Sequence, residues 1–463
     1  MPEKKQSAWR FLWRSQDIRK KLLITLGILI LFRIAANVPV PGANREILAA
    51  FFQSQSGQGG FIGFLNLLSG GTIQNFSLLS MGVYPYITAQ IILQLLIPII
   101  PALQRRMQED QREGRRWMEK WTYYLAVPMA VLSAIGQINI FNSLSTQALG
   151  PGQLILPFSF TGDLWLPSLT ALVVMTAGTM FAIWLGELIS EYGIRGQGLS
   201  LIIFAGIVSQ IPANIQTLLL DEQNRWILLT AMLVVIIATV LAIVYVQQGR
   251  RNVPIMYPQK SQVFYAIQRG KSVRMPQPTL PLMVNLSGMI PLIFASAILQ
   301  FPAIIASYFL SSETQWLRDL STSIQSFFNP AGVNSWGYWV LYFIMVVSFT
   351  YFYTTVIFEQ QNYGDNLKRS GAQIPGVHSG AATQKYLSRI QSRITLPGAL
   401  LLGTVAIMPF LLQLIIPAAA SNAGIFLLSS SGLLIVVGVV RDTFMNIEAE
   451  LKLHGYQEKL LIS

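Results

Sequence analysis

Ten long apolar stretches constrain this chain more than any other feature of its sequence. A membrane-spanning α-helix needs about 20 consecutive, mostly apolar residues. Composition agrees, because 52% of the 463 residues are hydrophobic and only 11% are charged, against about 25% in an ordinary soluble domain. The sequence therefore predicts an all-α polytopic membrane protein with ten transmembrane helices, at 22–38, 76–100, 121–141, 165–187, 199–219, 226–246, 283–309, 337–358, 394–416 and 425–441.

The basic residues predict the orientation of these spans. The net charge is +12, and ten spans place both termini on the same side. Arg33 lies near the outer end of the first span, and the loops on the far side hold only Arg45, Arg225 and Arg318. All other Lys and Arg residues fall in the termini and in alternate loops. Because basic residues gather in cytoplasmic segments, both termini are predicted to be cytoplasmic.

Two segments outside the spans leave alternatives open. The apolar segment 59–71 is too short to cross a membrane and is bounded by glycines. It either re-enters a cavity among the spans, where protein can cover irregular backbone, or lies on the outer surface as an interfacial helix. The first 21 residues place Trp9 and Trp13 among basic residues. They form either an amphipathic helix on the cytoplasmic membrane surface or a disordered basic leader.

Two long cytoplasmic loops, 247–282 and 359–393, are rich in basic residues. Prolines and the run 252–257 favour extended structure or a hairpin in the first loop rather than a helix. Loops of this length usually carry function. The alternative is that their charges only fix the topology.

The predicted spans contain almost no ionisable residues, and this limits the classes of function that the chain can have. Glu187, Arg441 and Asp442 lie at cytoplasmic span ends, and both histidines are cytoplasmic. An ion-coupled transporter normally needs an ionisable group within the membrane. The sequence also contains no cysteine and no phosphate-binding loop motif. We therefore expect no enzyme, cofactor or metal site, which leaves a pore, a scaffold or a receptor.

A pore without charges must seal by shape and dewetting, as rings of apolar side chains can. Branched aliphatic residues beside Gly and Pro are candidates for such a ring. They occur at 82–87, 199–206, 288–294 and 432–438. Each of these stretches, taken alone, is equally a pattern of ordinary helix packing.

At these stretches the chain resembles the SecY family, whose members are the central subunits of the bacterial and chloroplast Sec protein-conducting channel. The resemblance covers nearly the whole chain and is most specific at 69–96, 193–208, 280–299, 365–377 and 431–440. It implies a clamshell of two inverted five-helix halves, 1–222 and 223–463, around an hourglass pore. It also implies that the clamshell opens sideways between the second and seventh spans, and that a plug helix at about 60–70 closes the channel.

The resemblance also implies roles for individual residues. The pore ring corresponds to Val83, Ile87, Ile203, Leu286, Ile290 and Ile435. The plug corresponds to Gly60, Phe61, Ile62, Gly63, Phe64, Leu65, Asn66, Leu67, Leu68, Ser69 and Gly70. The lateral gate and gating positions correspond to Gln94, Ser200, Phe294 and Leu434. Docking of a ribosome or motor corresponds to Arg250, Arg251, Lys260, Arg269, Lys271, Lys368, Arg369 and His378.

The chain departs from the family pattern in the second cytoplasmic loop. His378 and Ser379 stand where the family commonly has Arg and then Pro, and a neutral or partly charged His weakens a fixed positive contact. In the loop before the fifth span, Gln197 lies between two glycines where the family has Asn.

The function implied by the resemblance is passive passage of unfolded secretory polypeptides, with lateral release of transmembrane segments. The implied partners are SecE-like and SecG-like small subunits, the SecA motor ATPase, the ribosome, signal sequences and nascent chains, a YidC-like insertase and membrane lipid. The implied location is a bacterial plasma membrane or a thylakoid membrane. The alternatives from other classes are a secondary transporter with inverted repeats, and a scaffold or insertase-like receptor without a continuous pore.

Overall fold

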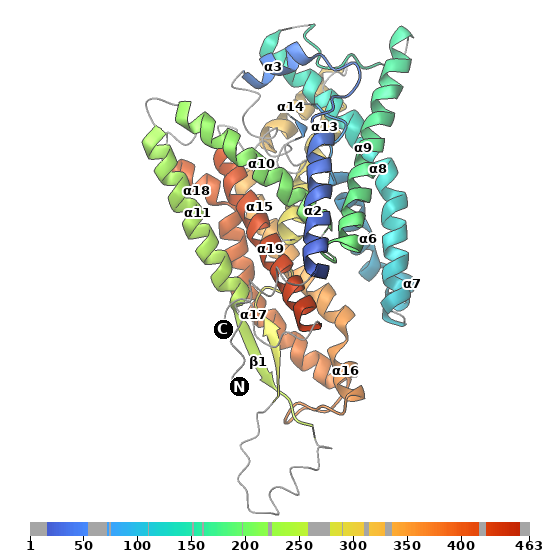
Figure 1. The fold of residues 1–463 in the computed structure, drawn as a ribbon, viewed down its shortest axis with the longest axis vertical. Coiled ribbons are helices and arrows are strands. Elements are labelled where there is room, and N and C mark those ends of the chain that lie inside the picture. Colours follow the sequence, from blue (N-terminus) through green and yellow to red (C-terminus); the bar gives the residue numbers. More distant parts are fainter. Residues whose placement is uncertain are drawn as a thin grey trace, which may run out of the picture.

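The computed structural model is a bundle of long helices with a small β-hairpin at one end (Figure 1). It describes residues 16–53, 72–73, 76–109, 111–150, 152–159, 162–196, 198–220, 225–257, 278–288, 290–309, 314–328, 336–415 and 423–453. The main elements up to the hairpin are α2 (Gln16–Ala35), α3 (Arg45–Gln53), α6 (Tyr84–Ile99), α7 (Pro101–Glu109), α8 (Gln111–Leu149), η2 (Gly162–Leu164), α9 (Trp165–Tyr192), α10 (Gly198–Leu220), α11 (Arg225–Gln248) and β1 (Arg250–Pro254). They are followed by β2 (Thr279–Met283), α13 (Ile290–Ser307), α14 (Gln315–Phe327), α15 (Trp336–Gln361), α16 (Tyr363–Arg369), α17 (Ala381–Ala406), α18 (Met408–Ile415) and α19 (Ala423–Leu453).

Each of the ten predicted stretches contains an α-helix. Within the described part of the chain, α8, α9, α11 and α15 contain apolar windows long enough to cross a membrane. Shorter apolar helices occur in α6, α10 and α13. The structure is therefore that of a polytopic helical membrane protein, and four of its predicted spans meet the length and hydropathy expected of a membrane helix.

Three of the predicted spans differ clearly from the helices that form. The stretch 283–309 starts at the last residue of β2, and its helix α13 begins only at Ile290. In the stretch 76–100, the helix begins only at Tyr84, because Phe76 and Gly82 have positive φ angles of 40° and 53°. The residues before the helix turn back instead, and the Leu78 amide donates to the Val38 carbonyl at 2.9 Å. The stretch 394–416 lies partly in α17, which begins at Ala381, and partly in the separate helix α18.

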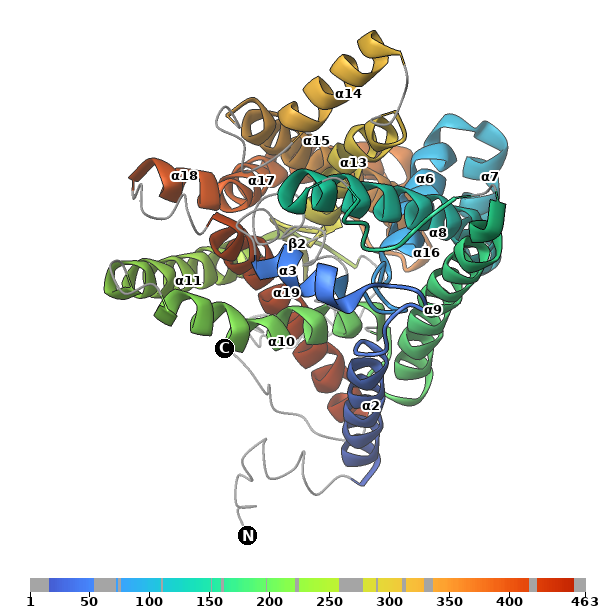
Figure 2. The ribbon, with the colours of Figure 1, turned by 90° about the horizontal axis from the view of Figure 1, so that it is seen from above.

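In Figure 2, α2, α6, α7, α8 and α9 of the first half lie toward one side and α11, α17 and α18 of the second half toward the other, while α10 lies beside α11 and α19. In the first half α9 packs against α2, α8 and α10, and α8 packs against α6. In the second half α15 packs against α13 and α17, and α19 packs against α11. Contacts of α10 with α19, and of α13 with α6 and α8, join the two groups.

Some of this packing is close enough to require glycine. A Cβ on Gly178 of α9 would lie 1.9 Å from the carbonyl oxygen of Leu78. A Cβ on Gly198, at the start of α10, would lie 1.7 Å from the carbonyl oxygen of Gly186. Both contacts are with backbone, so a side chain at either position would force the elements apart.

The hairpin, α16 and the early part of α17 lie at one end of the bundle, while α3 and α14 lie toward the other (Figure 1). The strands pair antiparallel, with Arg250 opposite Met283 and Pro254 opposite Thr279. This confirms the extended structure predicted for the first loop. An ion pair joins Lys21, near the beginning of α2, to Glu450, near the end of α19.

Candidate functional site

An aliphatic cluster lies where helices from both halves of the chain meet. Val83 precedes α6, Ile203 lies on α10 and Ile435 lies on α19, and all three are buried in the largest hydrophobic cluster of the described residues. Ile87 on α6 and Ile290 on α13 are partly buried and pack against the same cluster. Five of the six residues that the sequence predicts for a pore ring thus lie in, or pack against, the same large hydrophobic cluster.

Leu286 does not join these five residues. It lies between β2 and α13 and packs against a separate hydrophobic cluster that includes Val253, Leu282 and Leu387. That cluster belongs to the hairpin, to the loop 359–393 and to the start of α17. Leu286 therefore packs with the two long loops and lies apart from the other five predicted ring residues.

Two helix starts position the aliphatic cluster. Val83 and Ile290 lie at the beginning of α6 and α13, and each follows a glycine in the left-handed region, with φ 53° at Gly82 and 64° at Gly288. Glycine adopts this conformation without a steric penalty. The helix α6 thus begins at Tyr84 and α13 at Ile290, each two residues after a glycine of this kind.

A polar turn fixes the start of α13. The buried side chain of Asn285 donates from Nδ2 to the Gly288 carbonyl at 3.0 Å, and accepts at Oδ1 from the Ser287 hydroxyl at 3.1 Å. Buried amides are expected to be hydrogen-bonded in this way. Sequence reasoning did not single out Asn285, and the available signal was a polar pair directly before an apolar helix.

Tyrosine side chains connect α13 to the first half of the chain. The Tyr84 hydroxyl on α6 donates to the Ala297 carbonyl on α13 at 3.4 Å, which is a long hydrogen bond. The Tyr308 hydroxyl, one residue beyond α13, donates to the Leu132 carbonyl on α8 at 2.7 Å. Of these helices, α6 and α13 contain the second and seventh spans, between which the lateral opening is predicted. Neither tyrosine was singled out from the sequence.

Two of the predicted gating residues meet at one further tyrosine. The buried Gln94 of α6 approaches Tyr353 of α15, and Gln94 Oε1 has no hydrogen-bond partner among the described residues. The Phe294 ring of α13 contacts the Tyr353 ring edge to face, with 5.6 Å between the centroids. Ser200 is half-buried near the start of α10, and Leu434 lies on α19.

The two loops that are predicted to be cytoplasmic form a single platform. Met256 of the first loop and Gln373 of the second exchange backbone hydrogen bonds of 2.8 Å in both directions. Their apolar residues share one core, in which Ile255, Leu367 and Ile374 are buried. The Gln384 side chain of α17 closes the second loop, because its Oε1 accepts from the Gly364 amide at 2.9 Å.

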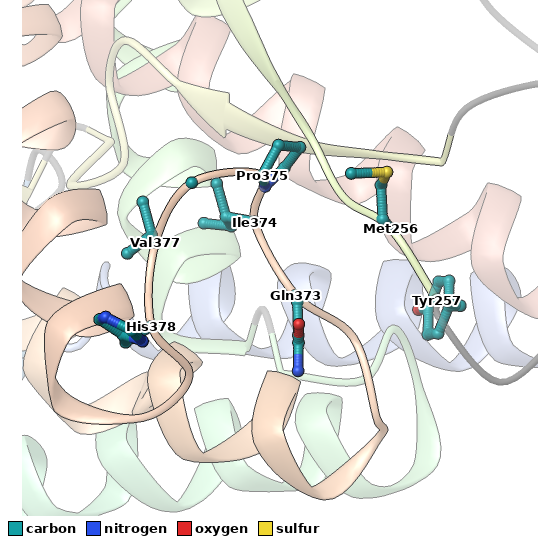
Figure 3. Close-up of a pocket in the computed structure, with 8 residues that line it drawn as sticks. Met256, Tyr257, Gln373, Ile374, Pro375, Val377 and His378 are labelled. Carbon is teal, nitrogen blue, oxygen red and sulfur yellow. The ribbon is translucent and has the colours of Figure 1, made fainter.

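A pocket of about 520 Å³ lies between these loops. Met256 and Tyr257 line one side of it and the loop 373–378 lines the other (Figure 3). His378, at the end of that loop, is exposed, and its carbonyl accepts a hydrogen bond from the Thr383 hydroxyl at 2.8 Å. The backbone of the loop is thus attached to α17, while the imidazole faces outward.

The basic residues of the platform that the structure describes are all exposed. Arg250 and Arg251 lie on β1, and Lys368 and Arg369 end α16. The predicted docking residues Lys260, Arg269 and Lys271, the predicted plug at 60–70, Gln197 and the first 15 residues lie outside the described residues.

Comparisons with known proteins identify the family of this chain. The family model SecY matches residues 77–444. Protein translocase subunit SecY of Streptomyces scabiei is 33% identical over 448 residues, covering 96% of this chain and 97% of the relative. Protein translocase subunit SecY of Mycobacterium tuberculosis is 35% identical over 453 residues, with the same coverage.

Two solved structures share the fold, each with a TM-score of 0.62 and coverage of 99% of this chain and 98% of theirs. One is described as a protein-conducting channel and is 18% identical, and the other is a SecY protein described with its plug domain and is 19% identical. The fold is therefore that of a helical membrane channel. With the family match and the relatives above, the chain belongs to the SecY family.

Proposed function

We propose that this chain is the pore-forming subunit of a protein translocation channel. It passes unfolded secretory polypeptides across the membrane and releases transmembrane segments sideways into it. The observation that carries this proposal is that five predicted ring residues, at the start of α6 and on α6, α10, α13 and α19, lie in or against one hydrophobic cluster shared by both halves of the chain. An apolar constriction holds back water and ions, and it makes no specific polar contact with any one passing side chain.

The proposed architecture has ten transmembrane helices in two inverted halves, 1–222 and 223–463, around an hourglass pore. The matching starts of α6 and α13 support the repeat, because each follows a glycine with positive φ. The segment 60–70 is the proposed plug, on the strength of its glycine-bounded apolar sequence. The proposed lateral gate lies between α6 and α13, where Gln94 and Phe294 approach the same tyrosine.

The proposed role of the cytoplasmic platform is to receive the machinery that feeds the channel. The exposed Arg250, Arg251, Lys368 and Arg369 support this role, because cationic side chains suit the phosphates of ribosomal RNA. The proposed partners are the ribosome, a SecA motor, SecE-like and SecG-like subunits and a YidC-like insertase. Both termini are proposed to be cytoplasmic, in a bacterial plasma membrane or a thylakoid membrane.

Cross-linking to an arrested substrate tests the pore. The chain contains no cysteine, so Ile87→Cys and Ile290→Cys each introduce a single thiol. A secretory precursor carrying one cysteine and a folded blocking domain is arrested in the reconstituted complex by its motor. We expect disulfides from both positions to the precursor. The matched control is Ile344→Cys on the exposed side of α15. Cross-linking at position 344 alone would contradict the proposal.

A further inference from the structure

The helix α14, between α13 and α15, is amphipathic in a way that the channel function does not explain. Its apolar residues occupy one side, and the exposed polar residues Asp319, Thr322 and Ser326 occupy the other. One edge of the apolar side faces protein, because Ser321 is buried and Leu317, Ile324 and Phe328 are half-buried. This edge accounts for the packing of α14 against α13.

The other edge of the apolar side is open. Trp316, Leu320 and Phe327 are 64%, 50% and 48% exposed. Residues four and eleven positions apart lie on the same face of an α-helix, so these three side chains form one continuous edge. Burial of a large apolar side chain stabilises a folded protein. Leaving this edge in water would therefore forgo a substantial stabilisation.

The open edge continues into the surface of a membrane-crossing helix. The Phe327 ring lies beside Gly337, whose Cβ would come within 2.9 Å of it. The preceding residue, Trp336, begins α15 and is 64% exposed. Val340 and Ile344 follow at four-residue spacing and are also exposed. Because α15 is long and apolar enough to cross a membrane, we expect this exposed apolar face to contact lipid.

The helix also has the placement that an interfacial element needs. In Figure 2, α14 lies at the rim of the molecule and is seen along its length. In Figure 1, it lies toward the end opposite the hairpin. Trp residues are enriched at the membrane–water boundary, because the indole combines an apolar ring with a hydrogen-bond donor. Trp316 and Trp336 provide such side chains at both ends of the open edge.

We propose that α14 is an interfacial helix bound to the outer leaflet of the bilayer. Its Trp316–Leu320–Phe327 edge is buried at the boundary of headgroups and acyl chains, and its polar side faces water. Helices of this amphipathic type lie in the plane of the interface. The occupant of the open edge is lipid, since the edge continues the lipid-facing surface of α15. As α14 follows α13 by a short connection, it anchors the outer end of that helix to the membrane.

Single spin labels in lipid nanodiscs test this placement. Since the chain lacks cysteine, Leu320→Cys and Thr322→Cys carry one nitroxide each, on the apolar edge and on the polar side of the same helix. The full chain is used in complex with its small subunits. We expect the label at 320 to be relaxed by oxygen, which concentrates in lipid. We expect the label at 322 to be relaxed by a water-soluble nickel chelate.

Two results would overturn the proposal. Equal relaxation by the nickel chelate at both positions would mean that α14 stands in water. Protection of position 320 from both reagents would mean that a protein surface covers the edge. Phe327→Cys provides a second reading of the same edge if the Leu320→Cys complex does not assemble. Monodisperse elution of each complex shows that the label has not disrupted the fold.

Discussion

The Tyr308 hydroxyl donates a 2.7 Å hydrogen bond to the carbonyl oxygen of Leu132, and so joins the end of α13 to α8. Closer to the middle of α13, Ala297 accepts the longer bond from Tyr84 on α6. The helix α13 is thus attached to the first half of the chain at two levels. A lateral opening between the halves would have to break both bonds.

The first prediction concerns this attachment. Tyr308→Phe removes the hydroxyl but keeps the ring, and a typical net hydrogen bond contributes about 0.5–1.5 kcal/mol. The closed arrangement loses that stabilisation, so opening becomes up to about tenfold easier. We expect increased export of precursors with defective signal sequences. The control is Tyr245→Phe, which removes a hydroxyl from the exposed surface of α11. Equal export by the two variants would exclude a gating role for Tyr308.

A second prediction tests the aliphatic cluster as a seal. Ile290→Asn replaces a partly buried branched side chain with a polar amide at the start of α13. The amide stabilises water in the constriction, so ion leak through the reconstituted channel should rise and selection against defective signal sequences should weaken. Ile290→Leu keeps the side chain apolar and should behave like the wild type. Unchanged conductance in Ile290→Asn would remove this residue from the proposed ring.

A third prediction concerns the platform. Arg250→Glu combined with Arg251→Glu reverses two exposed charges on β1. Binding of ribosomes or motor to the reconstituted complex should weaken, and the affinity should become less dependent on salt, because fewer counterions are released. The control combines Arg45→Glu and Arg225→Glu. It changes the net charge by the same amount in loops predicted to lie on the opposite side. If the variant with Arg250→Glu and Arg251→Glu binds with wild-type affinity, these two arginines act only in setting the topology.

The positions of the helices could be predicted because hydropathy identifies the long apolar segments that avoid water. Their starts were less predictable where glycine controls the backbone. The stretch 76–83 is as apolar as a span, yet Gly82 and Phe76 turn the chain before Tyr84 begins α6. Hydropathy does not register such a turn, since it counts side chains and carries no information on φ.

The candidate site likewise contains some features that the sequence predicts and others that it does not. The motifs predict the ring residues, five of which lie in or against one hydrophobic cluster, and they also predict the basic loops. The partners of Tyr84 and Tyr308 could not, because both are backbone carbonyls on distant helices. The bond between Met256 and Gln373, which makes one platform of two loops, also joins backbone to backbone. Contacts to backbone atoms depend on the tertiary arrangement and not on the residue type, so the sequence does not reveal them.

The last prediction tests whether packing of α9 holds the ring in position. In Gly178→Ala, the new methyl group would come within 1.9 Å of the Leu78 carbonyl oxygen. Backbone cannot rotate away as a side chain can, so α9 and the turn before α6 must separate. Overpacking of this kind typically costs about 1–3 kcal/mol. Gly27→Ala on α2 is the matched control, because no heavy atom lies within 4 Å of its Cβ position.

The thermal unfolding midpoint of the detergent-solubilised complex should fall in Gly178→Ala and stay the same or rise in Gly27→Ala, since alanine favours helix. The effect should also reach function. Leu78 lies in the turn that ends at Val83, so displacing the turn moves a ring residue, and ion leak should rise in Gly178→Ala but not in Gly27→Ala. A lower midpoint with unchanged leak would show that the turn shifts without carrying Val83 with it.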